Sequence, residues 1–157
     1  MTQKKTLILG IGNAIRGDDA VGLFLAREIA KDPPTGAIVR ELETSGFEII
    51  DEMAGFERVI IIDAMRTPDA TQVGEALVAT LDERQSTPTL LPSHGFDFAS
   101  LVHTWGSAHP ELIPGEILFI LVKVTDVDEF REGLSAAVQG YFPGICADVR
   151  RLIRQVL

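Results

Sequence analysis

The fold is decided by residues 7–22, which read LILGIGNAIRGDDAVG. The first part is a short apolar run that ends in glycine, which is typical of a strand covered on both faces. Gly10 and Gly12 allow the chain to turn sharply at the carboxyl end of this strand. Asp18 and Asp19 follow where a helix would begin, in positions that favour an N-cap and acidic first-turn residues. The next apolar residues have helical spacing: Val21, Phe24, Leu25 and Ile29.

The same alternation continues along the chain. Apolar runs predict strands at residues 5–11, 37–42, 59–62, 74–79 and 117–124. Helical patterns cover residues 18–31, 47–53, 98–105 and 135–157. Strands that alternate with helices predict a single three-layer α/β/α domain over residues 1–157, whose twisted, mostly parallel sheet has about five strands and helices on both faces. The run at 59–62 is the most strand-like, and the weaker run at 74–79 is expected at an edge of the sheet.

Two helices carry local signals. Ser45 and Glu48 have the S-x-x-E spacing of a capping box, in which Ser45 caps a short helix and Glu48 reaches back to its backbone N–H. Pro143 lies inside the last helical pattern and is expected to kink or divide that helix.

Ligands of open parallel sheets bind beyond the carboxyl ends of the strands, so the loop after Gly12 is the first place to expect chemistry. The loop does not complete the dinucleotide motif G-x-G-x-x-G, because the third glycine is replaced by Ile15, and no Gly-Lys-Ser/Thr follows as in a P-loop. Two carboxylates at its end would repel a phosphate and attract a cation. The alternative is that Asp18 and Asp19 only cap the helix.

Three groups could form a metal site: the pair Asp18 and Asp19, then Asp63, and His94. Asp63 directly follows the apolar run at 59–62, so both carboxylate positions are expected at one edge of a parallel sheet. Two carboxylates and an imidazole suit a borderline divalent metal such as nickel or zinc, and three protein ligands leave the site open. Each residue also has a structural interpretation, in which Asp63 caps a turn and His94 is an ordinary loop residue. His103 and His109 then compete with His94.

Composition excludes several other classes. A net charge of −9 disfavours nucleic acid and anionic membranes as partners. No apolar run approaches the roughly 20 residues that span a bilayer, and the absence of a signal-peptide pattern predicts a cytoplasmic protein. The single cysteine, Cys146, lies in a helical pattern and is expected in the core rather than as a nucleophile. There is no G-x-S-x-G motif for a serine hydrolase.

The motifs resemble those of the nickel-iron hydrogenase maturation proteases, the endopeptidases that trim the C-terminus of the hydrogenase large subunit. The similarity begins with residues 9–13, LGIGN, followed by DDAVG at 18–22, which resembles the family's G-x-G-N and D-D/E-x-x-G signature. The run IIIDA at 60–64 resembles its second acidic motif, and Ser93-His94 its histidine motif. The match continues in order and spacing down to residues 133–135, before the last helix.

The resemblance implies an endopeptidase whose Asp19, Asp63 and His94 contact nickel already installed in the precursor, with no organic cofactor. Asp18 is left as the helix cap, so Asp18→Asn is expected to matter less than Asp19→Asn. The family's motifs do not identify a nucleophile, so the catalytic residues stay unassigned. Residues 41–46 read ELETSG where the family often has Asp-Gly-Gly in a loop linked to substrate recognition.

Two other functions fit the same residues. In the first, a nucleotide- or nucleoside-handling α/β enzyme uses residues 10–13 to cradle an anion, and Asp63 reads a hydroxyl group. In the second, a non-catalytic nickel chaperone uses the three ligands to hold the metal. The partner expected for the protease is the hydrogenase large-subunit precursor, a folded protein with a flexible C-terminal extension.

Overall fold

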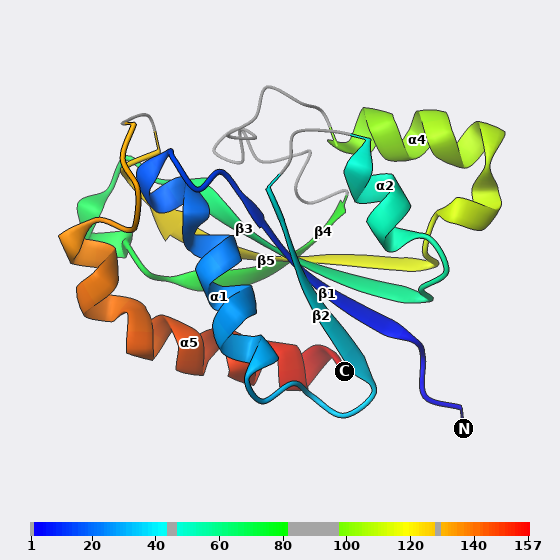
Figure 1. Ribbon diagram of the computed structural model, residues 1–157, viewed down its shortest axis with the longest axis horizontal. Helices are drawn as coiled ribbons and strands as arrows, with labels where there is room; N and C mark the ends of the chain where they lie inside the picture. The colour runs from blue at the N-terminus through cyan, green and yellow to red at the C-terminus, as the bar shows by residue number, and fades with distance from the viewer. Residues whose placement is uncertain (1, 44–46, 82–97, 128–129) are drawn as a thin grey trace.

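The computed structural model describes residues 2–43, 47–81, 98–127 and 130–157 (Figure 1). Strands and helices alternate along most of the chain, as the sequence predicts. The elements in order are β1 (Thr6–Gly12), the 3-10 turn η1 (Gly17–Ala20), α1 (Val21–Ala30), β2 (Ala37–Glu43), α2 (Glu48–Met53), β3 (Arg58–Arg66), η2 (Ala70–Gln72), β4 (Ala76–Thr80), α4 (Phe98–Ala108), η3 (Pro110–Leu112), β5 (Glu116–Val124) and α5 (Ala136–Val156).

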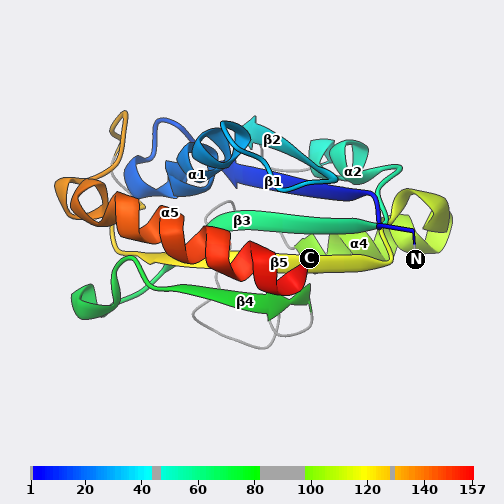
Figure 2. The same cartoon turned by 90° about the horizontal axis from the view of Figure 1, so that it is seen from below.

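The five strands form one sheet in the order β2-β1-β3-β5-β4 (Figure 2). The pairs β1–β2, β1–β3 and β3–β5 are parallel, and β4 is antiparallel to β5. The most apolar strand, β3, is therefore central, and the weaker β4 lies at an edge, which confirms the edge position predicted for residues 74–79.

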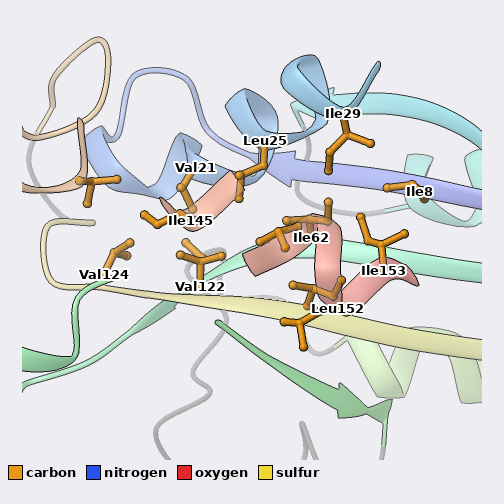
Figure 3. Close-up of a cluster of buried hydrophobic side chains, with 14 of the residues drawn as sticks. Ile8, Val21, Leu25, Ile29, Ile62, Val122, Val124, Ile145, Leu152 and Ile153 are labelled. Carbon is orange, nitrogen blue, oxygen red and sulfur yellow. The ribbon is translucent and has the colours of Figure 1, made fainter. Parts of the chain in front are cut away.

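Helices cover both faces of the sheet, so the predicted three-layer architecture is confirmed. On one face α1 and α5 pack over side chains such as Ile8 and Ile62, and Figure 3 shows Leu25 and Ile153 turned toward this cluster. On the other face α2 and α4 cover a second cluster that includes Phe119. Each strand of the sheet interior is thus buried on both sides, which explains why β3 and β5 are continuously apolar. None of the described helices is long and apolar enough to cross a membrane.

Two glycines let α1 lie directly against the sheet. A Cβ atom on Gly10 would collide with the carbonyl oxygen of Gly22 and the Cβ of Ala26. A Cβ atom on Gly22 would collide with the carbonyl oxygens of Ile11 and Ile62. The glycines of the first motif therefore serve helix–strand packing, and this packing brings the start of α1 against Ile62 in β3.

The structure corrects three local predictions. The helix predicted over residues 18–31 starts as the 3-10 turn η1 and becomes α-helical only at Val21. The strand predicted to stop before Asp63 continues to Arg66, because β5 pairs with it beyond that point. The last helix is one continuous element from Ala136 to Val156, so Pro143 does not divide it. Ser45 lies outside the described residues, so its cap stays a prediction, although the N-cap position of α2 is held by Phe47 rather than by Ser45.

Candidate metal-recognition site

Asp63 lies where the pairing of β3 with β1 has stopped and its pairing with β5 continues. The pairing of β1 with β3 stops at Gly10 and Ile62, whereas β5 pairs with β3 through Asp63 and on to Arg66. Asp63 is thus the first residue of β3 beyond its pairing with β1, and its Oδ1 accepts a 2.8 Å hydrogen bond from the N–H of Ala64. Although Asp63 is inside a strand, it occupies the carboxyl edge of the sheet relative to β1, as the sequence predicts.

Asp19 lies in η1, after the loop that follows β1. Its Oδ2 accepts a 3.1 Å hydrogen bond from the N–H of Asn13, and the Oδ1 of Asn13 accepts a 3.1 Å bond from the N–H of Ile15. The loop is therefore closed on itself by the two side chains that flank it. A Cβ atom on Gly12 would collide with the backbone oxygen of Asp19, so the motif glycine also permits this close return of the chain.

Asp19 and Asp63 belong to different elements but lie at the same end of the sheet, the carboxyl end of its parallel strands. η1 packs against both β1 and β3, and Gly22 seats the start of α1 against Ile62, the residue before Asp63. Asp18, Asp19 and Asp63 each expose at most 1% of their surface. Carboxylates are almost never so deeply buried without specific partners, so this edge is the chemically distinctive part of the described structure.

Asp18 does not cap α1, contrary to the prediction. The N-cap positions of η1 and α1 belong to Arg16 and Ala20, and neither has a side-chain cap. Asp18 instead binds Ser135, whose N–H donates to Oδ1 at 2.7 Å and whose hydroxyl donates to Oδ2 at 2.8 Å. Ser135 is the N-cap of α5, so Asp18 links the first motif to the last helix.

The connection between β5 and α5 is hydrogen-bonded to the loop that carries Asp18 and Asp19. The N–H of Gly17 donates to the oxygen of Arg131, and the N–H of Arg131 donates to the oxygen of Ile15, both at 2.9 Å. The N–H of Asp18 donates to the oxygen of Asp126, also at 2.9 Å, and Asp126 forms an ion pair with Arg131. Gly17 has φ +56°, a conformation that favours glycine, and its missing Cβ leaves room for Asp126. Sequence reasoning missed Asp126, Arg131 and Ser135 as supports; only the serine before a helical pattern signals a role, as an N-cap.

Of the three candidate histidines, the structure describes His103 and His109. His94 lies outside the described residues, so its place beside the carboxylates stays a prediction. His109 lies in the turn before β5, whose first residue pairs with Arg58 at the opposite, amino end of the parallel strands. It binds Glu111 at 3.3 Å and packs on Trp105 of α4. His103 is exposed on α4. Within the described ranges, no three His, Cys, Asp or Glu side chains are grouped so that they could hold a metal ion.

Cys146 packs against the core cluster on α5, as predicted. Burial is the main cause that raises the pKa of its thiol above the ordinary value, and the negative charge of Glu28 adds to the effect. A thiol of this kind is mostly protonated at neutral pH and is a poor nucleophile.

Solved structures of hydrogenase maturation proteases have the same fold. HybD from Thermococcus kodakarensis, described as a NiFe hydrogenase maturation protease, aligns over 94% of this chain and 98% of its own, with 25% identity and a TM-score of 0.73. The hydrogenase maturating endopeptidase HybD from E. coli aligns over 97% and 93%, with 20% identity and a TM-score of 0.69. The hydrogenase 2 maturation peptidase from Thaumarchaeota archaeon SCGC_AB-539-E09 aligns over 96% and 98%, with 22% identity and a TM-score of 0.64.

No family model matches the chain, and no curated protein sequence matches it. The likeness is therefore carried by the three-dimensional structure and by the motifs in the sequence. Over nearly its whole length the chain has the fold of the nickel-iron hydrogenase maturation proteases, and the resemblance predicted from its motifs is confirmed.

Proposed function

We propose that this protein is an endopeptidase that removes the C-terminal extension of a nickel-iron hydrogenase large-subunit precursor after nickel insertion. It recognises the metal through Asp19, Asp63 and His94. The observation that carries the proposal is the likeness to HybD from Thermococcus kodakarensis over 94% of the chain. The burial of Asp19 and Asp63 at one edge of the sheet supports the choice of site.

Nickel belongs to the substrate in this proposal. The chain contributes two carboxylates and an imidazole, a donor set that suits a borderline divalent ion. The Asn13 N–H fixes the orientation of Asp19, and the Ala64 N–H fixes that of Asp63. Such second contacts orient the ligands of a metal site and are costly to remove. Because three protein ligands leave a metal open, the remaining positions are filled by ligands of the precursor.

The backbone of the first loop argues against the nucleotide-handling alternative. A phosphate cradle needs backbone N–H groups that point at the anion. Here the N–H groups of residues 13 and 15–19 already donate to protein acceptors. Dinucleotide-binding folds use an acidic residue after the second strand to bind the ribose. Glu41, near the end of β2, is instead paired with Arg27 at 2.6 Å, and this hydrogen bond raises the pKa of Arg27. The first loop is therefore built to hold Asp19 rather than a phosphate.

The precursor would present two features to this site, its metal centre and an extended C-terminal segment. An exposed edge strand can bind an extended segment by β-augmentation. β4 lies at an edge beside β5, and we propose it as the docking strand for the extension. The reaction is expected in the cytoplasm.

The test compares three substrates: the nickel-loaded precursor, the nickel-free precursor, and a short isolated peptide that spans the cleavage site and the C-terminal extension. Intact-mass spectrometry measures shortening of each substrate. We expect cleavage of the nickel-loaded precursor alone. Efficient cleavage of the peptide without nickel would contradict metal recognition. Tight nickel binding by the isolated protein without cleavage of any substrate would support the chaperone alternative instead.

A further inference from the structure

Asp18 and Asp19 are adjacent, equally buried carboxylates that point to different partners. Asp19 accepts from the N–H of Asn13 inside its own loop. Asp18 accepts from the N–H and the hydroxyl of Ser135, so each of its two oxygens is bonded to the same residue. The first carboxylate of the motif is therefore occupied by the protein, while the second is the predicted metal ligand.

Ser135 is a firm anchor because it is itself built into a helix. Its Oγ accepts a 3.3 Å hydrogen bond from the N–H of Val138, as an N-cap residue does. The helix that it caps, α5, has 21 residues and buries Val138, Val149 and Ile153 in the core. Asp18 therefore cannot move with these two hydrogen bonds intact unless the core-packed helix moves as well.

The remaining attachments of the loop reach the irregular connection before α5. They include the backbone bonds that join Ile15 and Gly17 to Arg131, and Asp18 to Asp126. The Asp18 carboxylate, in contrast, reaches the helix itself. A charged group that accepts two short hydrogen bonds makes a stronger and more directional link than neutral backbone bonds. Asp18 is therefore well placed to set the position of the turn that carries its neighbour.

We propose that Asp18 is a positioning residue, which acts through Ser135 to hold the η1 turn so that the Asp19 carboxylate keeps its place beside Asp63. The role in cleavage rests on the proposed function of this site. The positional role does not rest on that function, because the hydrogen bond from the Asn13 N–H to Asp19 shows whether the Asp19 carboxylate has moved. Asp18 and Ser135 contact neither substrate nor metal in this account.

The first test is spectroscopic. In Ser135→Ala, which removes the hydroxyl donor, we expect the backbone amide resonance of Asn13 to shift and its hydrogen exchange to accelerate by about tenfold, the effect of losing one charge-assisted hydrogen bond. Ser135→Thr keeps the hydroxyl and should restore the wild-type signal. If Ser135→Ala does not fold, Asp18→Asn carries the same measurement, since the amide replaces one acceptor oxygen with a donor.

Two controls separate positioning from general loss of stability. Asp69→Asn alters another side-chain cap, that of η2, where Asp69 accepts from Thr71. Ile153→Val removes one methyl group from the buried face of α5. Neither variant should change the Asn13 amide signal, although Ile153→Val should lower the Tm.

The second test measures cleavage of nickel-loaded precursor. Ser135→Ala should lower kcat by about tenfold with an unchanged KM, because the positioning acts on the metal ligand and not on precursor docking. If the wild-type protein cleaves no precursor, the proposed function fails, and the Asn13 signal alone decides the positional role. An Asn13 signal that is unchanged in Ser135→Ala, or that Ser135→Thr does not restore, would overturn the proposal.

Discussion

Asp18 and Ser135 lie 117 residues apart in the sequence and are joined by two hydrogen bonds of 2.7 and 2.8 Å. This contact connects the loop after the first strand to the start of the last helix. It also changes the expected role of Asp18, from a local cap to a buried long-range partner.

Replacing Asp18 by Ala should lower the free energy of unfolding by about 2–3 kcal/mol, because two partly buried donors of Ser135 lose a charged acceptor. Urea unfolding measures the loss. Asp69→Ala is the matched control, since Asp69 is an exposed cap on η2 and its loss should matter much less. Equal losses in the two variants would show that the Asp18 contact is no more than a surface cap.

Gly22→Ala should destabilise the fold by about 1–3 kcal/mol, because the added methyl group would collide with the carbonyl oxygens of Ile11 and Ile62. Gly140→Ala in α5 is the control of opposite sign, since nothing lies within 4 Å of an added Cβ. That change should stabilise the helix by about 0.5–1 kcal/mol. Thermal and urea unfolding of both variants check the prediction, and a stable Gly22→Ala would contradict the close approach of α1 to the sheet.

Cys146→Ala should leave precursor cleavage at the wild-type rate, since Cys146 packs against the core and its raised pKa keeps the thiol protonated at neutral pH. Alkylation of the wild-type thiol should be slow at neutral pH and should accelerate only toward and above the ordinary thiol pKa of 9.0. Loss of cleavage in a folded Cys146→Ala variant would instead indicate cysteine chemistry.

Glu116 links the amino end of β5 to Lys4 at 2.8 Å and to Arg58 at 2.9 Å. The hydrogen bond from Lys4 is the main cause that lowers the pKa of Glu116 below its ordinary value of 4.5, and Arg58 adds to it. A lowered pKa in the folded state means that the ion pair stabilises the protein above pH 4.5 and that this contribution disappears as the pH falls through the folded-state pKa.

Urea unfolding of the wild type and of Glu116→Gln between about pH 3 and pH 7 checks this dependence. The wild type should be more stable at neutral pH by at most about 1 kcal/mol, because the group is partly exposed. The difference should narrow on acidification. A difference that widens below pH 4.5 would contradict the assignment.

The sequence predicts the fold well because its signals are local. Apolar runs such as residues 59–62 and 117–124 predict buried strands. Gly10 and Gly12, predicted at the turn after the first strand, lie inside β1, where they admit the close approach of α1 and η1. The end of β3 was misplaced at Asp63 because the pattern of one strand does not show how far its neighbours extend. β1 stops pairing at that point, whereas β5 continues to Arg66.

The sequence predicts the site only in part. Its one basis is that parallel strands bring their carboxyl ends to the same side of the sheet. The motifs place Asp19 and Asp63 at one edge, and the structure has them there. The bonds from Ser135 and Asp126 to the loop could not be predicted, because they join segments more than 100 residues apart and no local pattern encodes them. The sequence predicts that Pro143 kinks or divides α5; the structure shows no division, because the helix continues through Pro143 while its buried face packs on the sheet.

Cleavage of nickel-loaded precursor by Asp19→Asn, Asp63→Asn and His94→Ala, measured side by side with the wild type, tests the central claim most directly. Each variant should fold with a near-native Tm and fail to shorten the precursor, because each loses one ligand for the nickel of the substrate. His103→Ala, an exposed histidine of α4, should cleave at the wild-type rate. Wild-type cleavage by His94→Ala, or by both carboxylate variants, would contradict the account.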